Sequence, residues 1–341
     1  MDINEVGFRH VKEGLFDVCS SSFIFCARTV TAMATTNGTN GNMPQKTREE
    51  SNHHMESSIW NDVKFRPDDI IITTYAKSGT TWVQQIVSQL IHQGDPTVPA
   101  GALSPWVDLR IVPKEAMLGL IESQTHRRFL KTHLPLDALV WNPQVKYIFI
   151  ARDGRDMVWS IHNHMYRATD TFYSFFENTG YEGQPPKRPS ENPKDIFDQL
   201  VKDDMPSSLG WPFWSHIRGW WEHRDQPNLL LVHFNDLKAD LEGGIKRIAK
   251  FLEIPDMPED KFKDVVEHST FDWMKEHAEL AAPPQAEVAW ENGAKDFVYK
   301  GTNSRWKDVL SEEDCKAYEE RAKKELGEEC ANWLQHGGWL K

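Results

Sequence analysis

Residues 73–82 read TTYAKSGTTW, and they follow the apolar run 70–72 and lead into an amphipathic segment at 82–92. This order predicts a strand, a tight polar loop and a helix. The loop places backbone N–H groups, hydroxyls and the cation of Lys77 at a helix N-terminus, where the helix dipole favours an anion. Gly79 allows the backbone to approach a ligand closely. The sequence therefore predicts a phosphate cradle.

The usual nucleoside-triphosphate loop, G-x-x-x-x-G-K-[ST], does not fit this stretch. Lys77 precedes the single glycine by two positions, and no earlier glycine lies in the window. The pattern indicates an anionic ligand other than ATP or GTP.

Apolar runs alternate with segments of helical period along the rest of the chain. The runs lie at 70–72, 129–130, 147–151 and 229–234, and the helical segments at 82–92, 156–166, 211–223 and 239–252. Such alternation predicts a single α/β domain with a central parallel sheet flanked by helices and a P-loop-like phosphate loop. Two regions, 94–115 and 169–208, interrupt the alternation, and we expect them to be long loops that help to build an acceptor pocket.

Composition limits the partners of the chain. The 341 residues carry 39 Lys and Arg against 51 Asp and Glu, a net charge of −12. We therefore expect no nucleic-acid and no membrane partner. The four cysteines form no C-x-x-C pair, which favours a reducing, cytoplasmic location and argues against a metal site.

The N-terminal part of the chain differs in composition from the rest. Residues 35–52 are rich in Thr, Asn and Gly and then charged, as disordered segments are. We expect residues 1–57 to be a disordered leader and 58–341 to form the domain. A targeting segment, or a true start at Met33 or Met43, stays open.

A second motif, RRFLKTHLP at 127–135, carries a cation and a base. Lys131 and His133 are two residues apart on a predicted strand and therefore share one face. Histidine can accept a proton near neutral pH. His133 is the candidate catalytic base.

A third motif, KYIFIARDGRDMVWS at 146–160, joins a buried strand to a helix that we expect to begin near Asp153. Arg152 ends the strand, at the edge of the sheet where ligands of open α/β sheets bind. A guanidinium can bond two phosphate oxygens at once. The alternative is a surface ion pair between Arg152 and Asp156.

These motifs resemble those of the cytosolic sulfotransferases, which use 3′-phosphoadenylyl sulfate (PAPS). The resemblance runs from about Trp60 to Trp306 and implies sulfuryl transfer in which Lys77 neutralises the leaving phosphate, Lys131 supports the sulfuryl oxygens and His133 takes the acceptor proton. It also implies a set of cofactor-binding residues. These are Lys77, Ser78, Gly79, Thr80, Thr81 and Trp82 around the 5′-phosphate, Arg152 and Ser160 at the 3′-phosphate, and Phe234, Ser269 and Phe271 with Trp82 around the adenine.

The chain departs from the family wording at several positions. Ala76 replaces a proline of the loop, and Phe234 replaces a tyrosine, so that a hydroxyl donor is lost. Tyr299 stands where the family has an arginine. Three groups are candidates to replace that arginine, the side chain of Lys300, the backbone N–H of Gly301 and the side chain of Arg305. These variant motifs resemble those of microbial-type members of the family more than those of the animal enzymes that act on xenobiotics.

The resemblance implies a small, apolar or phenolic acceptor that is sulfated on a hydroxyl, with an amine as the open alternative, and no metal. Aromatic residues at 172–176 and 210–221 are candidates for the pocket wall, although most of them are expected in the core. An ATP-dependent small-molecule kinase and a non-catalytic nucleotide-binding protein are the alternative functions. Monomer and homodimer both stay open.

Overall fold

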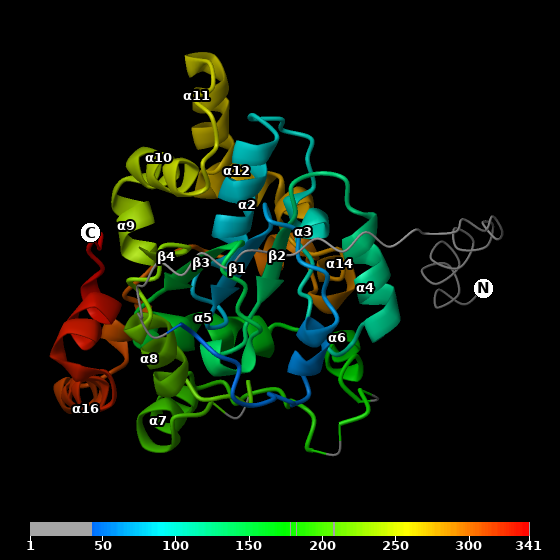
Figure 1. The fold of residues 1–341 in the computed structure, drawn as a ribbon. Helices are drawn as coiled ribbons and strands as arrows, with labels where there is room; N and C mark the ends of the chain where they lie inside the picture. Colours follow the sequence, from blue (N-terminus) through cyan, green and yellow to red (C-terminus); the bar gives the residue numbers. More distant parts are fainter. Residues whose placement is uncertain (1–42, 178, 182, 207–208, 341) are drawn as a thin grey trace. The chain divides into compact units, whose positions relative to one another are not determined.

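The computed structural model describes residues 43–177, 179–181, 183–206 and 209–340. Its centre is a parallel sheet in the order β2-β1-β3-β4 (Figure 1). The strands are β1 (Ile70–Thr74), β2 (Phe129–Thr132), β3 (Lys146–Ala151) and β4 (Leu229–His233). Ile70 pairs with Phe129 on one side and with Lys146 on the other, so all four carboxyl ends meet at one edge. The predicted α/β fold with a parallel sheet is confirmed.

Each strand is buried on both faces because helices cover the sheet from both sides. Helices α2 (Thr80–Ile91) and α10 (Leu241–Phe251) lie on one side of the sheet, and α5 (Gly154–Tyr166) and α8 (Trp214–Glu222) lie on the other (Figure 1). Ile70, Ile72 and Ile148 belong to the apolar cluster that contains α2 and α10, whereas Ile71 and Phe149 belong to the cluster that contains α5 and α8. Strands that are buried on both faces read as continuous apolar runs, which is why the sequence located them.

The helices connect the strands and extend past them. Their bounds are α2 (Thr80–Ile91), α3 (Ala100–Leu103), α4 (Lys114–Ser123), α5 (Gly154–Tyr166), α6 (Asp170–Ser174), α7 (Lys194–Asp203), α8 (Trp214–Glu222), α9 (Phe234–Ala239), α10 (Leu241–Phe251), α11 (Glu259–His268), α12 (Phe271–Glu276), α13 (Ala278–Ala281), α14 (Ala286–Ala289), α15 (Ala294–Phe297) and α16 (Glu312–His336), with short 3₁₀ turns at Ser57–Asn61, Leu136–Ala138 and Arg305–Asp308. Among the described residues, no helix has the length and apolarity that crossing a bilayer requires.

The two regions expected to be loops contain short helices. Residues 94–115 include α3 and the start of α4, and residues 169–208 include α6 and α7. The sequence analysis expected long loops in both regions and did not predict these helices, because short helices that are stabilised by tertiary packing give a weak periodic signal.

The described chain begins before the predicted domain boundary. Residues 43–57 are part of it, and Met55 is fully buried in the larger core cluster. His54 is 6% exposed. Ordered packing therefore extends to the N-terminal side of residue 57. Residues 1–42 lie outside the described residues, and the leader predicted there stays a prediction.

Candidate active site

The loop between β1 and α2 is a tight cradle. Lys77 and Gly79 both have positive φ, 66° and 119°. A Cβ atom on Gly79 would lie 2.8 Å from Cδ1 of Ile150 and 3.1 Å from Cδ2 of Phe234, so only glycine fits. Ser78 is fully buried, and its Oγ has no hydrogen-bond partner in the described structure. A buried hydroxyl without a partner is costly, which fits a loop built to bind an external group.

Helix α2 begins at Thr80, directly above the end of β1. Oγ1 of Thr80 lies 2.7 Å from Oγ1 of Thr74. Thr81 is half-buried in the same first turn. The N-terminal amides of this helix therefore face the carboxyl edge of the sheet, where the dipole favours an anion.

His133 follows β2 and lies beside the end of β1. Its Nδ1 is 2.8 Å from the carbonyl oxygen of Thr74 and 3.1 Å from the hydroxyl of the same residue. A carbonyl oxygen can only accept, so Nδ1 carries the hydrogen and Nε2 holds the lone pair. Burial, together with Lys131, lowers the pKa of His133 well below its ordinary value. The imidazole is therefore neutral at physiological pH.

Lys131 points from β2 toward an indole. Its Nζ lies 4.8 Å from the ring centroid of Trp106. Burial lowers the pKa of Lys131 to about 8, although the nearby carboxylate of Asp108 acts in the opposite direction. Lys131 lies on β2 and His133 lies one residue past its end, and both side chains contact the ring of Trp106.

Lys77 is held by neutral groups. Its Nζ lies 3.2 Å from Nδ1 of His164 on α5 and 4.9 Å from the centroid of the Phe297 ring. Burial, followed by the repulsion of Lys131 and Arg152, lowers the pKa of Lys77 to about 7. In the described structure its close side-chain partners are thus neutral, and a buried cation in such surroundings is suited to bind an anion.

Arg152 has its guanidinium fork occupied by the C-terminal segment. Nε and one terminal nitrogen donate to Oδ1 of Asn303, and that nitrogen also donates to the carbonyl of Thr302 at 2.9 Å. The other terminal nitrogen donates to the carbonyl of Lys77 at 3.3 Å. Asp156, the alternative partner weighed from the sequence, instead accepts from the backbone N–H of Ser304 at 2.6 Å. Four of the five N–H groups of Arg152 are thus bonded within the chain.

Aromatic and polar residues gather beside Arg152. Cζ of Arg152 lies 4.3 Å from the centroid of the Phe234 ring. The rings of Phe234 and Trp82 meet edge to face, with their centroids 5.2 Å apart. Nε1 of Trp82 donates to the carbonyl of Ser269 at 2.8 Å. Oγ of Ser269 is buried without a partner among the described residues. The sequence predicted these residues around an adenine, and the structure brings them together.

Gly301 packs against the predicted adenine-side residue Phe271. A Cβ atom on Gly301, whose φ is 61°, would lie 2.5 Å from Cδ2 of that ring. Phe271 as a whole is 36% exposed. A planar face that is partly open and covered by a glycine is suited to stacking a base.

The candidate replacements for the missing arginine surround Tyr299. Nζ of Lys300 lies 5.2 Å from the centroid of the Tyr299 ring, and Cζ of Arg305 lies 5.9 Å from it. A further cation, Arg167, has its Cζ 5.1 Å from the same centroid. Burial lowers the pKa of Arg152 to about 10, and the charge of Arg305 acts in the same direction. Lys300 is exposed and makes no hydrogen bond to another site residue in the described part of the chain, so its predicted role stays a prediction. Ser160 lies half-buried on α5, one turn before His164.

Three residues at this edge were missed from the sequence. His164 holds Lys77, Asn303 holds Arg152, and Trp106 contacts Lys131. The sequence could have predicted His164 at the site, because His164 follows Ser160 by four residues and therefore lies on the same helix face. No local pattern marks the other two.

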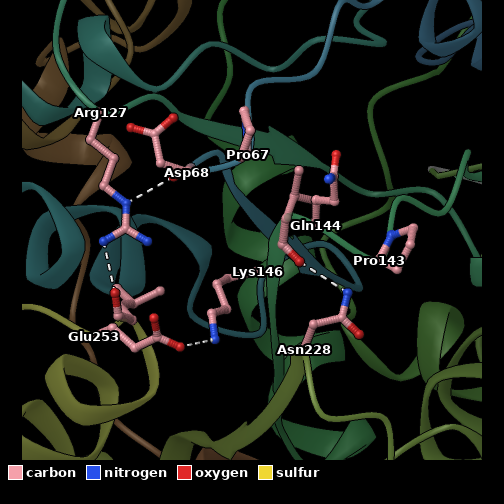
Figure 2. Close-up of a pocket in the computed structure, with 10 residues that line it drawn as sticks. Pro67, Asp68, Arg127, Pro143, Gln144, Lys146, Asn228 and Glu253 are labelled. Atoms are coloured by element: carbon pink, nitrogen blue, oxygen red, sulfur yellow. Dashed lines mark hydrogen bonds and ion pairs between the residues drawn. The ribbon is translucent and has the colours of Figure 1, made fainter. Parts of the chain in front are cut away.

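A separate hollow lies at the opposite, amino-terminal edge of the sheet (Figure 2). Its two cations are already bonded: Arg127 donates to the carbonyls of Asp68 and Leu252, and Lys146 pairs with Glu253 at 2.7 Å. Since ligands of parallel sheets bind at the carboxyl edge, this hollow is distinct from the candidate site.

Together, the sheet and the cation-lined loop at its carboxyl edge define an α/β protein that binds an anionic ligand. The family model described as "Sulfotransferase domain" matches residues 67–329, and the chain belongs to this family. The predicted family membership is confirmed.

Known proteins align over most of the chain. A glycolipid sulfotransferase of Mycobacterium bovis is 29% identical and covers 82% of this chain and 91% of its own length. Sulfotransferase 1 family member D1 of Mus musculus is 27% identical, covering 75% of this chain and 82% of its own. The solved structure of mouse sulfotransferase SULT7A1 complexed with PAP has a similar fold, with a TM-score of 0.58 and 20% sequence identity. The match covers 82% of this chain and 92% of the SULT7A1 chain.

Proposed function

We propose that this protein transfers a sulfuryl group from PAPS to a hydroxyl of a small-molecule acceptor, with His133 as the general base. One observation carries the proposal: Nδ1 of His133 lies 2.8 Å from the carbonyl oxygen of Thr74 at the end of β1, which places the lone pair of the neutral ring on Nε2. Family membership supports the reaction class.

Several features of the chain fit PAPS as the co-substrate. Lys77 and Lys131 have no carboxylate hydrogen-bonded to them in the described structure, and their positive charges favour a doubly anionic ligand. The hydroxyls of Ser78 and Ser269 are buried without partners. A solved relative is complexed with PAP. We assign Ser78, Thr80 and Thr81 to the 5′-phosphate, and Trp82, Phe234, Ser269 and Phe271 to the adenine.

The 3′-phosphate is assigned to Arg152 and Ser160, with Arg305 as the substitute for the arginine that Tyr299 replaces. Because the fork of Arg152 is bonded to Asn303, the segment from Tyr299 to Ser304 must release it before two phosphate oxygens can be bound.

The chemistry is in-line sulfuryl transfer. PAPS supplies the sulfuryl group: an acceptor-oxygen-to-sulfur bond forms while the bond from sulfur to the 5′-phosphate oxygen breaks, which leaves adenosine 3′,5′-bisphosphate. His133 accepts the acceptor's proton on Nε2. Lys77 stabilises the charge that develops on the leaving phosphate, and Lys131 stabilises the sulfuryl oxygens.

The surroundings of His133 favour an apolar or phenolic acceptor. Its ring is edge-on to Trp106 at 4.6 Å and parallel to Trp211 at 6.4 Å. On the other side of Lys77, the ring centroid of His164 lies 4.5 Å from that of Trp290 and 5.9 Å from that of Phe172. Aromatic walls with a few polar groups are typical of small-molecule pockets.

A labelled-donor screen tests the reaction class. The purified full chain is incubated with a panel of phenols, sterols, small alcohols, amines and glycolipids, with either ³⁵S-labelled PAPS or γ-³²P-labelled ATP, in buffer with EDTA and in buffer with Mg²⁺. We expect ³⁵S to reach a phenol or an apolar alcohol in both buffers. Transfer of ³²P in the magnesium buffer, or PAPS binding without transfer to any acceptor, would contradict the proposal.

We also propose a cytoplasmic location, on the ground that Cys315 and Cys330 are free thiols, as is usual in a reducing compartment. Fractionation of source cells, with immunodetection of the chain, tests this. Recovery in a secreted or membrane fraction would contradict it.

A further inference from the structure

A buried carboxylate beside the site binds two indoles. Asp108 is 2% exposed. Its Oδ1 accepts from Nε1 of Trp60 at 3.1 Å, and its Oδ2 accepts from Nε1 of Trp106 at 3.0 Å. Each carboxylate oxygen thereby fixes one indole ring, because the indole N–H has a single direction.

The two indoles have different neighbours. Trp60 is 1% exposed and stacks on Phe65 at 6.1 Å, within the core. Trp106 is half-buried at the site: Nζ of Lys131 lies 4.8 Å from its centroid, and the ring of His133 lies 4.6 Å away at an interplanar angle of 84°. One indole therefore touches both groups that the proposed reaction needs opposite the loop.

Backbone hydrogen bonds also hold the segment around Trp106 against β2. The amide of Lys131 donates to the carbonyl of Pro105 at 3.0 Å, and the amide of Val107 donates to the carbonyl of Lys131 at 3.0 Å. Residues 105–107 thus lie against the free edge of β2. The ring of Trp106 is held by the sheet at its backbone and by Asp108 at its far end.

We propose that Trp106, anchored by Asp108, is a positioning residue that sets the places of Lys131 and His133, an inference that rests on the proposed function. Lys131 has four rotatable bonds and no hydrogen-bonded carboxylate in the described structure, so the indole face is its principal support. A phenyl ring would keep the apolar contact but would lose the N–H that fixes its tilt.

The matched variants are Trp106→Phe and Trp60→Phe. Both delete one indole N–H bond to Asp108, but only the first alters a ring that touches Lys131 and His133. Three readouts on the full chain separate the roles: thermal unfolding, steady-state kinetics with PAPS and the best acceptor of the panel, and the pKa of His133 from NMR of ¹⁵N-labelled imidazoles. His133 is assigned by comparison with His133→Ala, and Lys131, Lys77 and His216 are the other titratable groups that act on it.

We expect the unfolding temperature to fall to a similar extent in both variants. Only Trp106→Phe should lower kcat, by about tenfold, with the KM for PAPS changed by less than about twofold. Only this variant should raise the pKa of His133, by about one unit, because a looser ring admits water. If Trp106→Phe does not fold, Trp106→Tyr replaces it.

Equal losses of kcat in the two variants, or an unchanged His133 pKa in Trp106→Phe, would overturn the inference. The NMR measurement needs no turnover. A wild-type protein that transfers no sulfate would therefore contradict the proposed function, while the imidazole titration would still decide whether Trp106 positions His133.

Discussion

The Nζ of Lys77 lies 3.2 Å from Nδ1 of His164. The charged form of Lys77 can only donate, so it bonds to His164 when Nδ1 holds the lone pair. Burial, followed by Lys77, lowers the pKa of His164 well below its ordinary value. The cation of the phosphate loop is therefore held by a neutral acceptor, which an anionic ligand can replace.

His164→Phe should tighten the binding of adenosine 3′,5′-bisphosphate about tenfold, because the free state loses a bond that the bound state does not need. His164→Asn is the control, since its amide oxygen can take the place of Nδ1, and its affinity should stay within about threefold of wild type. Isothermal titration calorimetry measures both. Weaker binding by the phenylalanine variant would show that Lys77 keeps its bond to His164 in the complex.

Nucleotide binding should take up a proton. The pKa of Lys77 is about 7 in the free protein, and an adjacent anion favours the charged ammonium and raises this pKa. Lys77 is about half charged at pH 7, so binding should take up about 0.5 proton there, and affinity should fall as the pH rises above 7. Calorimetry in two buffers of different ionisation enthalpy measures the uptake. Lys77→Arg stays charged throughout, and an uptake that survives unchanged in that variant would contradict the assignment.

Asn303→Asp should weaken adenosine 3′,5′-bisphosphate binding at least about thirtyfold. The new carboxylate would lie at the fork of Arg152, where Oδ1 of Asn303 accepts from Nε at 3.0 Å, and would neutralise the cation and repel the phosphate. Asn303→Ala, which opens the fork, should bind as well as wild type or better. If the aspartate variant bound normally, Arg152 would not be a phosphate ligand.

Gly301→Ala and Gly327→Ala form a matched pair. Both glycines have positive φ, 61° and 74°, but a Cβ atom would meet Phe271 at 2.5 Å only at Gly301, and nothing within 4 Å at Gly327. Each variant should lower the free energy of unfolding by about 1 kcal/mol. Only Gly301→Ala should weaken adenosine 3′,5′-bisphosphate binding, by about tenfold, because it displaces the ring assigned to the adenine. Equal affinities in the two variants would remove Phe271 from the nucleotide site.

The features of the fold and the site that depend on local residue patterns could be predicted from the sequence. The strands are buried on both faces and read as apolar runs, and the loop from Lys77 to Trp82 and the pair Lys131 and His133 depend on short spacings. These groups converge because the carboxyl ends of parallel strands meet at one edge.

The contacts that complete the site were not predictable in this way. Asn303 meets Arg152 across 151 positions of the chain, and Trp106 and Asp108 lie in a segment without a helical or strand period. Such long-range contacts depend on how loops pack on the finished sheet, and a single sequence carries no local signal for them.

The proton acceptor is the centre of the proposed mechanism, and His133→Ala tests it most directly. The rate of ³⁵S transfer from saturating PAPS is measured beside the affinity for adenosine 3′,5′-bisphosphate. We predict a rate at least about 100-fold below wild type with an affinity within about threefold. A variant that transfers sulfate at the wild-type rate would contradict the assignment of His133 as the base.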